Sequence, residues 1–394
     1  MESINYMISS LIEYIDIMIS IAINKNLKEY IDELDNLKEQ VSNIKTLEDI
    51  NKYKIIIQEY DKKINEAKKE LTSREQALVD RGYLEEDVRK LSSFNNQDIE
   101  EKKRIILNRI TKNCNRTRNP ICIFIGGQPG CGKSTICRRL KKQKTTNGFV
   151  DISLDNYRSY HPNYLEIEDC IKKHWEGKQE TENDTKGNDI ADFTHNFASI
   201  MSDEILDETS KNIDFKAYNI LLEWGMRKPE EPLKRLRDLK SKNYTNIVDF
   251  ILVHKDISKE ACKIRADIMN NFSHIIRRVP DYFHNLCIET LPDSAKAIFE
   301  TGYKVDKTID KMMCTSRDNR IIWDQNNSED IRDVYHEYLN NKELSNGYSN
   351  SEDLAITSYS EENKGFTSEI DEMFNNKQSN TDENNNETKK SIIP

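Results

Sequence analysis

One stretch of fifteen residues constrains this chain more than any other. Residues 121–135 read ICIFIGGQPGCGKST, an apolar run that enters a glycine-rich turn and ends in Lys-Ser-Thr. The turn has the spacing G-x-x-x-x-G-K-[ST] of a phosphate-binding loop. Residues 121–125 predict a strand buried on both faces of a parallel sheet, and residues 133–142 predict a helix whose first amides point at an anion. We therefore expect a strand, a phosphate-binding loop and a helix in direct succession.

The residues of this loop have distinct expected roles. A Cβ at the glycines would block the close approach of the backbone to phosphate oxygens or forbid the required φ. Lys133 is expected to reach the outer phosphates of ATP, and the Ser134 hydroxyl to ligate Mg²⁺. A chance glycine-rich turn is disfavoured because the strand, loop and helix signals coincide. The expected ATP-binding positions are Gly127, Gln128, Pro129, Gly130, Cys131, Gly132, Lys133, Ser134 and Thr135.

Composition excludes several classes of partner. The 394 residues carry a net charge of -10, so the chain lacks the basic excess of a nucleic-acid-binding coat, and we expect no nucleic-acid partner. The eight cysteines form no C-x-x-C pair, which favours reduced core residues of a cytoplasmic protein. Residues 7–23 are apolar, but Glu13 and Asp16 interrupt them and no basic residue precedes them. This pattern predicts an amphipathic helix rather than a signal peptide or a membrane span.

The chain before the loop predicts an all-helical domain over residues 1–112. It has no proline and a single glycine, Gly82, and its apolar residues recur at steps of three and four. Restart signals at Thr46–Asp49 and Ser73–Gln76 divide the region into four or five helices. A bundle or coiled coil is expected here rather than a catalytic domain. One narrow apolar stripe comprises Leu34, Leu37, Val41 and Ile44.

Residues 113–340 predict an α/β domain with a parallel sheet flanked by helices. Short apolar runs alternate with helical segments, which is typical of that fold. The polar residues 176–192 predict a surface loop or insertion, and the polar residues 341–394 predict a disordered tail. The runs expected as further strands are Phe149–Leu154, Ala217–Leu222, Ile247–His254 and Arg320–Asp324.

Acidic residues follow two of these strands. Ligands bind outside the carboxyl ends of the strands in open parallel sheets. Asp155 follows the second strand and is our candidate general base for an acceptor hydroxyl, although an Asp that caps the next helix is an alternative. Glu223 ends the third strand, near the metal or the acceptor, and Arg227 follows it as a candidate phosphate or substrate contact.

Three arginines farther along the chain are candidates for charge neutralisation. Arg265, Arg277 and Arg278 lie in a helical sequence, and arginines stabilise the charge that develops on a transferring phosphate. A solvated basic helix face is the alternative. His161, His195 and His284 lack metal-ligand spacing, so we expect no metal held by the protein alone.

These motifs together resemble the zeta toxin family of toxin–antitoxin systems. The resemblance rests on residues 126–134, on residues 154–164 with His161-Pro162 after the second strand, and on residues 222–227. It implies a P-loop kinase fold. It also implies transfer of the γ-phosphate of ATP to the 3′-hydroxyl of the amino sugar in UDP-N-acetylglucosamine, which blocks cell-wall synthesis.

The resemblance also implies roles for individual residues. Lys133 and Ser134 would hold ATP and Mg²⁺, Asp155 would activate the sugar hydroxyl, and Glu204 and Glu223 would contact the sugar. His161 and Arg227 complete the expected substrate-binding set, and Arg265 with one of Arg277 or Arg278 would stabilise the transferring phosphate. The chain departs from the family at Trp224-Gly225, which replaces the expected Gly-Thr after the strand-end glutamate.

The helical region acquires a candidate role from the same resemblance. Zeta toxins are neutralised by a small helical antitoxin, so residues 1–112 could inhibit in cis, or an antitoxin could act in trans. A coiled-coil dimerisation arm is the alternative. For the whole protein, two further readings remain open. One is a kinase of another acceptor, such as a nucleoside, a nucleic-acid end or an antibiotic hydroxyl, and the other is an ATP-switched helical scaffold.

Overall fold

A computed structural model describes residues 2–24, 27–66, 70–142, 148–181, 184–269, 274–275 and 278–348. The chain packs as two compact units, Met1–Lys90 and Leu91–Pro394. Each unit is described by itself.

The first unit is helical. Its first three helices share one apolar core, in which Ile15, Met18, Ile50 and Ile57 are buried. The stripe predicted from Leu34 to Ile44 lies in this core, so the helical spacing of the apolar residues is confirmed. The helices are α1 (Glu2–Asn24), α2 (Lys28–Ser42), α3 (Leu47–Glu66), α4 (Ser73–Asp80) and α5 (Glu85–Leu91), whose last residue begins the second unit.

Two caps divide these helices, and one lies beside its predicted position. The Thr46 hydroxyl accepts a hydrogen bond from the Asp49 amide at 3.1 Å, as the sequence predicts. The second capping box begins at Thr72 instead of Ser73. The Thr72 hydroxyl accepts from the Glu75 amide, and the Glu75 carboxylate accepts from the Thr72 amide at 2.7 Å. Thr72 is therefore the capping residue, because it precedes Glu75 by the three residues that a capping box requires.

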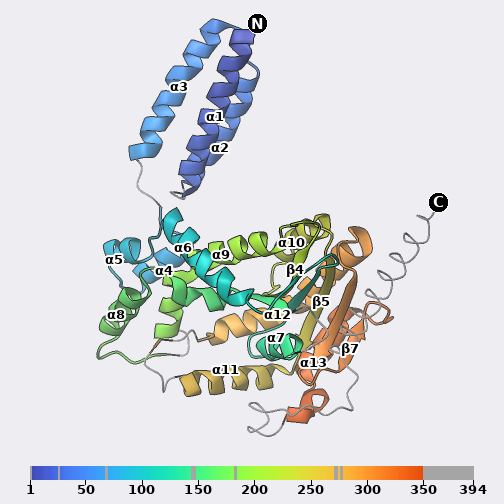
Figure 1. Cartoon of the computed structure of the whole chain (residues 1–394). Helices are drawn as coiled ribbons and strands as arrows, with labels where there is room; N and C mark the ends of the chain where they lie inside the picture. Colours follow the sequence, from blue (N-terminus) through green and yellow to red (C-terminus); the bar gives the residue numbers. More distant parts are fainter. Residues whose placement is uncertain are drawn as a thin grey trace, which may run out of the picture. The chain divides into compact units, whose positions relative to one another are not determined.

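The second unit is a sheet covered by helices (Figure 1). Five parallel strands lie in the order β3-β4-β2-β5-β6, which confirms the predicted α/β class. Two shorter strands run antiparallel, β7 beside β6 and β1 beside β4. The strands are β1 (Arg116–Thr117), β2 (Ile121–Gly126), β3 (Phe149–Ser153), β4 (Ala217–Glu223), β5 (Thr245–Leu252), β6 (Lys311–Ser316) and β7 (Ile321–Asp324).

One predicted strand has the opposite direction. Residues 320–324 were expected to continue the parallel sheet, but β7 pairs antiparallel with β6, a strand that the sequence reading missed. Only residues 317–320 separate β6 from β7. A parallel pair needs a much longer crossover connection, so this short loop imposes a hairpin.

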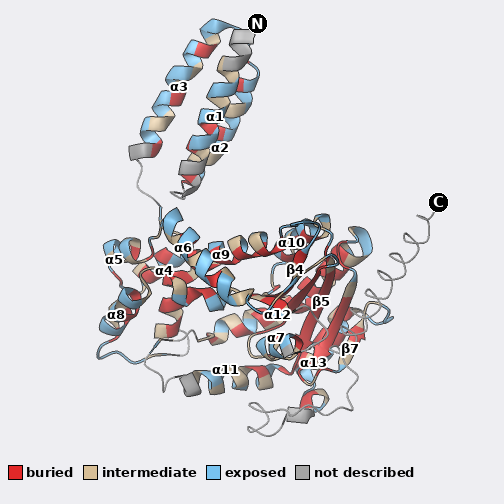
Figure 2. Ribbon diagram, viewed as in Figure 1, coloured by how far each residue is buried: buried red, intermediate tan, exposed pale blue. Residues whose placement is uncertain are grey.

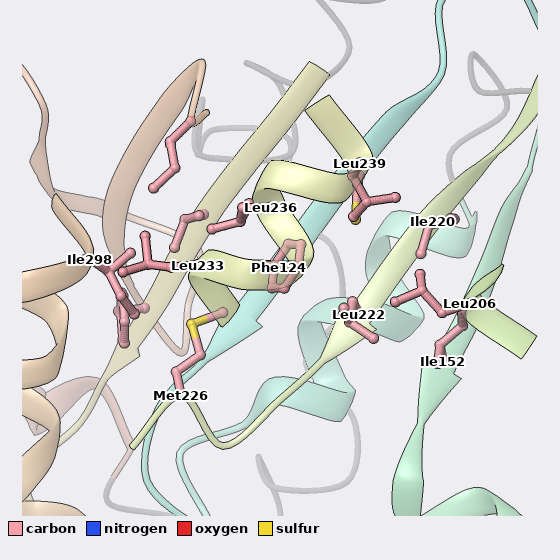
Figure 3. Close-up of a cluster of buried hydrophobic side chains, with 14 of the residues drawn as sticks. Phe124, Ile152, Leu206, Ile220, Leu222, Met226, Leu233, Leu236, Leu239 and Ile298 are labelled. Carbon is pink, nitrogen blue, oxygen red and sulfur yellow. The ribbon is translucent and has the colours of Figure 1, made fainter. Parts of the chain in front are cut away.

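The strands bury side chains on both faces of the sheet (Figure 2). Along β2, Cys122 and Phe124 join the larger core, while Ile121, Ile123 and Ile125 join the smaller one beside α7. Figure 3 shows part of the larger core, in which Phe124 lies among leucines of β4 and α10. The helices are α6 (Asn96–Ile110), α7 (Lys133–Lys142), α8 (Tyr164–His174), α9 (Lys186–Ser210), α10 (Glu230–Ser241), α11 (Lys255–Met269), α12 (Asp281–Ile298) and α13 (Ile331–Asn340), with 3₁₀ helices η1 (Leu154–Tyr160) and η3 (Lys342–Tyr348) and the π-helix η2 (Phe299–Val305).

Three boundaries differ from the expected ones because of packing. Helix α6 buries Ile99 and Ile106 in the larger core, so the second unit begins about twenty residues before residue 113. The expected loop over residues 176–192 includes the start of α9, where Asp189 is buried and accepts from the Trp175 indole at 2.6 Å. The expected tail begins with η3, whose Ser345 hydroxyl accepts from the His254 amide at 3.1 Å, while residues 349–394 lie outside the described residues.

Candidate nucleotide and acceptor site

The glycine loop between β2 and α7 packs closely against backbone atoms of β5 and α11. Gly130 has φ +78°, and a Cβ there would lie 2.1 Å from the Ser258 carbonyl oxygen of α11. Gly127 has φ +133°, and its Cβ would lie 2.8 Å from the Ile251 carbonyl oxygen of β5. A side chain at either position would therefore displace the backbone, so the loop geometry requires glycine.

Gln128 anchors the loop from within. Its side chain is buried, and its Nε2 donates to the Val253 carbonyl oxygen at 2.7 Å. The loop is thus tied to the end of β5 independently of any ligand. This arrangement leaves the backbone preformed as a cradle for an anion.

Lys133 and Ser134 begin α7 and face the end of β4. Lys133 Nζ donates to the carbonyl oxygens of Gly127 at 2.9 Å and Gln128 at 3.1 Å. The Ser134 hydroxyl donates to Glu223 Oε2 at 3.1 Å. Burial raises the pKa of Glu223, while the Lys133 charge and the Ser134 hydroxyl oppose that shift. A lysine, a hydroxyl and a carboxylate therefore meet beside the glycine loop, and this set suits a nucleotide with its Mg²⁺.

Asp155 lies at the same edge of the sheet, in the first turn of η1 directly after β3. Its side chain is 49% exposed, and Arg158 Nε donates to its Oδ1 at 2.8 Å. Arg158 is itself buried, and its Nη1 donates to the Ala191 carbonyl oxygen of α9 at 2.8 Å. Ser153 of β3 is the register partner of Glu223 on β4, so Asp155 follows two residues beyond the position that faces Glu223. The alternative role of Asp155 as a helix cap finds no support, because Ser153 precedes η1 and no side-chain cap forms.

His161 does not lie open to a substrate. It is 3% exposed and packs edge-on against Phe94 and Phe197, with ring centroids 5.9 and 5.2 Å away. Burial lowers its pKa to about 4, so the imidazole is neutral at physiological pH. Its expected role in substrate binding is replaced by a role in the core.

The remaining predicted residues that the structure describes lie on α9, on α11 and in the segments after β4 and before α12. Glu204 on α9 pairs with Lys103 of α6 at 2.9 Å, and Arg278 pairs with Glu180 at 3.0 Å. Arg265 is exposed on α11. Arg227 lies 5.9 Å from the centre of the Phe283 ring. Arg277 falls outside the described residues.

Trp224, the departure from the family pattern, directs its bulk toward α10. Its amide donates to the Ile125 carbonyl oxygen at 3.2 Å, while the guanidinium of Arg235 lies 4.3 Å from the indole ring. Arg235 also pairs with Asp203, the residue before Glu204. The Trp224 ring thus packs against Arg235, which links α10 to α9.

Two arginines near the site were missed by the sequence reading. Arg158 follows Asp155 by three residues, which places both on one face of a tight helix, so this spacing was a usable signal. Arg317 contacts the glycine loop although it is 187 residues away from Gly130 along the chain. No motif around Arg317 in the sequence indicates this contact.

The described part of the chain contains no cluster of three or more His, Cys, Asp or Glu side chains arranged to hold a metal. None of its helices combines the length and the apolar character needed to cross a membrane.

Comparison with known proteins agrees with this geometry. The family model described as Zeta toxin matches residues 106–328, which is more than half of the chain. Toxin PezT of Streptococcus pneumoniae is 27% identical over 235 residues, covering 59% of this chain and 83% of that protein. Toxin zeta of Enterococcus hirae is 23% identical over 185 residues, covering 47% of this chain and 58% of that protein.

A solved structure shares the fold. It comes from a characterisation of the PezAT chromosomal toxin–antitoxin system of Streptococcus pneumoniae, with a TM-score of 0.51 and 22% identity. The match covers 73% of this chain and 98% of that one. Together with the glycine loop and the two strand-end carboxylates, the family match establishes that this chain belongs to the zeta toxin family, a family of kinase-like, nucleotide-binding toxins of toxin–antitoxin systems.

Proposed function

We propose that this protein uses ATP to phosphorylate the 3′-hydroxyl of the amino sugar in UDP-N-acetylglucosamine. The observation that carries the kinase activity is the meeting of Lys133, Ser134 and Glu223 beside the glycine loop, with Asp155 two residues beyond the Ser153 that pairs with Glu223. The choice of acceptor is supported by the family resemblance. The departure at Trp224 is linked through Arg235 to Asp203 of α9, the neighbour of the proposed acceptor contact Glu204, so the acceptor is the first property to measure.

The residues of the glycine loop fit the phosphates of ATP. The preformed cradle leaves room for the backbone to approach an anion, and Lys133 begins the following helix. When bound with ATP, a Mg²⁺ ion held by Ser134 would neutralise charge on the outer phosphates. Glu223 accepts from the same hydroxyl and would orient it.

In the proposed reaction, the acceptor oxygen forms a bond to the γ-phosphorus as the bond to the leaving ADP oxygen breaks. Asp155 accepts the proton of the acceptor hydroxyl, and Arg158 holds the carboxylate in place. Arg265 and Arg278 would neutralise charge on the transferring group. For Arg278 this requires an exchange of its partner Glu180 for phosphate.

The decisive experiment supplies the purified protein with ATP, Mg²⁺ and one acceptor at a time, and weighs the products. We expect a single added phosphate on UDP-N-acetylglucosamine and none on nucleosides, oligonucleotide ends or aminoglycosides. Phosphorylation of one of the other acceptors alone would keep the kinase and reject the sugar. Retained biological activity in the Asp155→Asn variant, with no product on any acceptor, would favour an ATP-switched scaffold.

We further propose that the helical unit restrains the kinase in cis. The unit has an apolar core of its own, and the family match begins only at residue 106. The packing of α6 fixes the truncation to use, because removal of residues 1–112 would take Ile99 and Ile106 out of the kinase core.

Expression in bacteria of a chain that begins at Leu91 should be toxic, and Asp155→Asn in the same truncated chain should abolish the toxicity. The intact chain should be tolerated. A truncated chain that phosphorylates its acceptor no faster than the intact one, and is equally harmless, would reject inhibition in cis. A change from dimer to monomer on truncation, at unchanged specific activity, would identify the helices as a dimerisation arm.

A further inference from the structure

Arg317 crosses the end of the sheet to contact the glycine loop. It is the first residue after β6, it is 8% exposed, and it lies 187 residues from Gly130 along the chain. Its Nη2 donates to the Gly130 carbonyl oxygen, and its Nε donates to the Cys131 carbonyl oxygen at 3.3 Å. One guanidinium therefore holds two successive peptide groups of the loop.

The stem and the backbone carbonyl of Arg317 make further contacts. A Cβ at Gly132 would lie 3.1 Å from Arg317 Cγ and 3.2 Å from its Nε, so the side chain packs directly against the third loop glycine. The Arg317 carbonyl oxygen accepts from Arg139 Nη1 of α7 at 3.0 Å. The loop, the helix that follows it and the β6–β7 hairpin are thus joined through one residue.

The geometry of the peptide group gives this contact a consequence. In a trans peptide the carbonyl and the N–H of the next residue point in opposite directions. The Cys131 carbonyl points at Arg317, so the Gly132 N–H points away from it, toward the inner side of the loop. The Cys131 N–H closes a turn onto the Gln128 carbonyl oxygen at 3.2 Å. Holding the Gly130 carbonyl thus supports the turn at Cys131, and holding the Cys131 carbonyl fixes the orientation of the Gly132 N–H that a phosphate would meet.

We propose that Arg317 is a positioning residue that orients the loop amides for the phosphates of the bound nucleotide. This inference rests on the proposed nucleotide binding and adds a residue to it that no part of the loop motif contains. Arg317 acts through the loop, since its Nη2 and Nε donate to the carbonyl oxygens of Gly130 and Cys131. Preorganised donors bind an anion more tightly because no ordering cost remains at the moment of binding.

The test measures the affinity of the full chain for ATP and for ADP by titration calorimetry, in the wild type, Arg317→Ala and Arg317→Lys. Arg317→Ala removes two hydrogen bonds from a charged donor. Bonds of this kind are strong enough that we expect nucleotide affinity to fall about tenfold or more. ATP and ADP should lose affinity alike, because the loop amides meet the phosphates that both share. The KM for the acceptor should not change. Arg317→Lys keeps the charge but cannot hold two carbonyls in a fixed plane, so it should recover only part of the affinity.

Arg320→Ala is the matched control. Arg320 lies on the same hairpin, where it pairs with Asp318, and its loss should leave both affinities unchanged. Full recovery by Arg317→Lys would assign the effect to charge alone and overturn the proposal, as would a folded Arg317→Ala variant that binds like the wild type. If Arg317→Ala does not fold, the lysine variant decides. If the wild type binds neither ATP nor ADP, the proposed function fails together with the role of Arg317. If the wild type binds nucleotide and the Arg317 variants bind equally well, only the role of Arg317 fails.

Discussion

The nucleotide side and the acceptor side of this site are built in different ways. On the nucleotide side, glycines lie against backbone atoms, and Gln128 is buried with its amide bonded to β5. On the acceptor side, the candidate residues are long charged side chains in ion pairs, such as Glu204 with Lys103 and Arg278 with Glu180. The first side is held by the backbone and by a buried amide, and the residues proposed for the second side are held by ion pairs.

This difference indicates where the family fold is rigid and where it can vary. A backbone cradle serves every nucleoside triphosphate, because it contacts phosphates alone. Partly exposed ion pairs contribute little stability, so they can be broken or replaced at little cost. We therefore expect differences between members of the family on the proposed acceptor side rather than on the nucleotide side.

We expect the largest loss of activity from substitution of Asp155, the proposed general base between the nucleotide and the acceptor. Asp155→Asn removes the proton acceptor and should lower kcat by about 10²–10⁴-fold, the usual contribution of a general base. ATP affinity should change little, because Asp155 lies on η1 with Arg158 as a partner, while Gln128 ties the glycine loop to the end of β5. A coupled turnover assay with saturating ATP and acceptor measures the change. Turnover close to that of the wild type would remove Asp155 from this role.

Lys133→Ala tests the nucleotide side by itself. Its two hydrogen bonds go to loop carbonyls, so the fold should persist while the charge near the phosphates is lost. We expect kcat to fall by about 10²–10³-fold, as on removal of one preorganised donor. Steady-state kinetics with a circular dichroism spectrum as the folding control measure this. We assign Lys133 to direct contact with the phosphates and Arg317 to positioning of the loop. A larger loss of kcat in Arg317→Ala than in Lys133→Ala would contradict this assignment.

Asp249 on β5 provides a buried carboxylate away from both sides. The Thr315 hydroxyl on β6 donates to its two oxygens at 3.0 and 2.9 Å, and burial raises its pKa to about 7. Since the folded pKa lies above the unfolded one, the stabilisation is complete below about pH 4 and is lost as the pH rises through about 7. Asp249→Asn should reduce this loss, by about 2–4 kcal/mol at pH 8.

Urea unfolding at several pH values measures that difference. Thr315→Val removes the hydroxyl that favours the ionised form, so the loss of stability should move to higher pH in that variant. Identical pH profiles for the wild type and Asp249→Asn would show that Asp249 does not titrate in this range.

The smallest effect is expected at an acceptor-side ion pair. Lys103→Met releases Glu204 from its partner, and exposed pairs of this kind are worth about 0.2–1 kcal/mol, so the KM for the acceptor should fall by no more than about fivefold. Lys102→Met is the control, because Lys102 pairs with its neighbour Glu101 at the surface. Unchanged KM values in both Lys103→Met and Glu204→Gln would place Glu204 outside the acceptor site.

Features of the sequence that depend on near neighbours were predicted well. The strand, loop and α7 lie where the residues from Ile121 to Lys142 place them, and the apolar stripe of α2 is buried as its spacing requires. The carboxylates Asp155 and Glu223 follow their strands, and parallel strands bring such ends to one edge. Backbone conformation and side-chain spacing within an element are fixed by residues a few positions apart, which explains this success.

Only the tertiary structure decided which distant residues meet. His161 follows a strand as a substrate ligand would, yet the aromatic rings of Phe94 and Phe197 enclose it. Helix α6 joins the kinase core because Ile99 and Ile106 find apolar partners there, and no local pattern states which core a helix will join. Arg317 reaches the glycine loop because β6 lies beside β5 and the hairpin ends at that edge. Such contacts depend on the path of the whole chain, and the apolar surface buried along that path selects it.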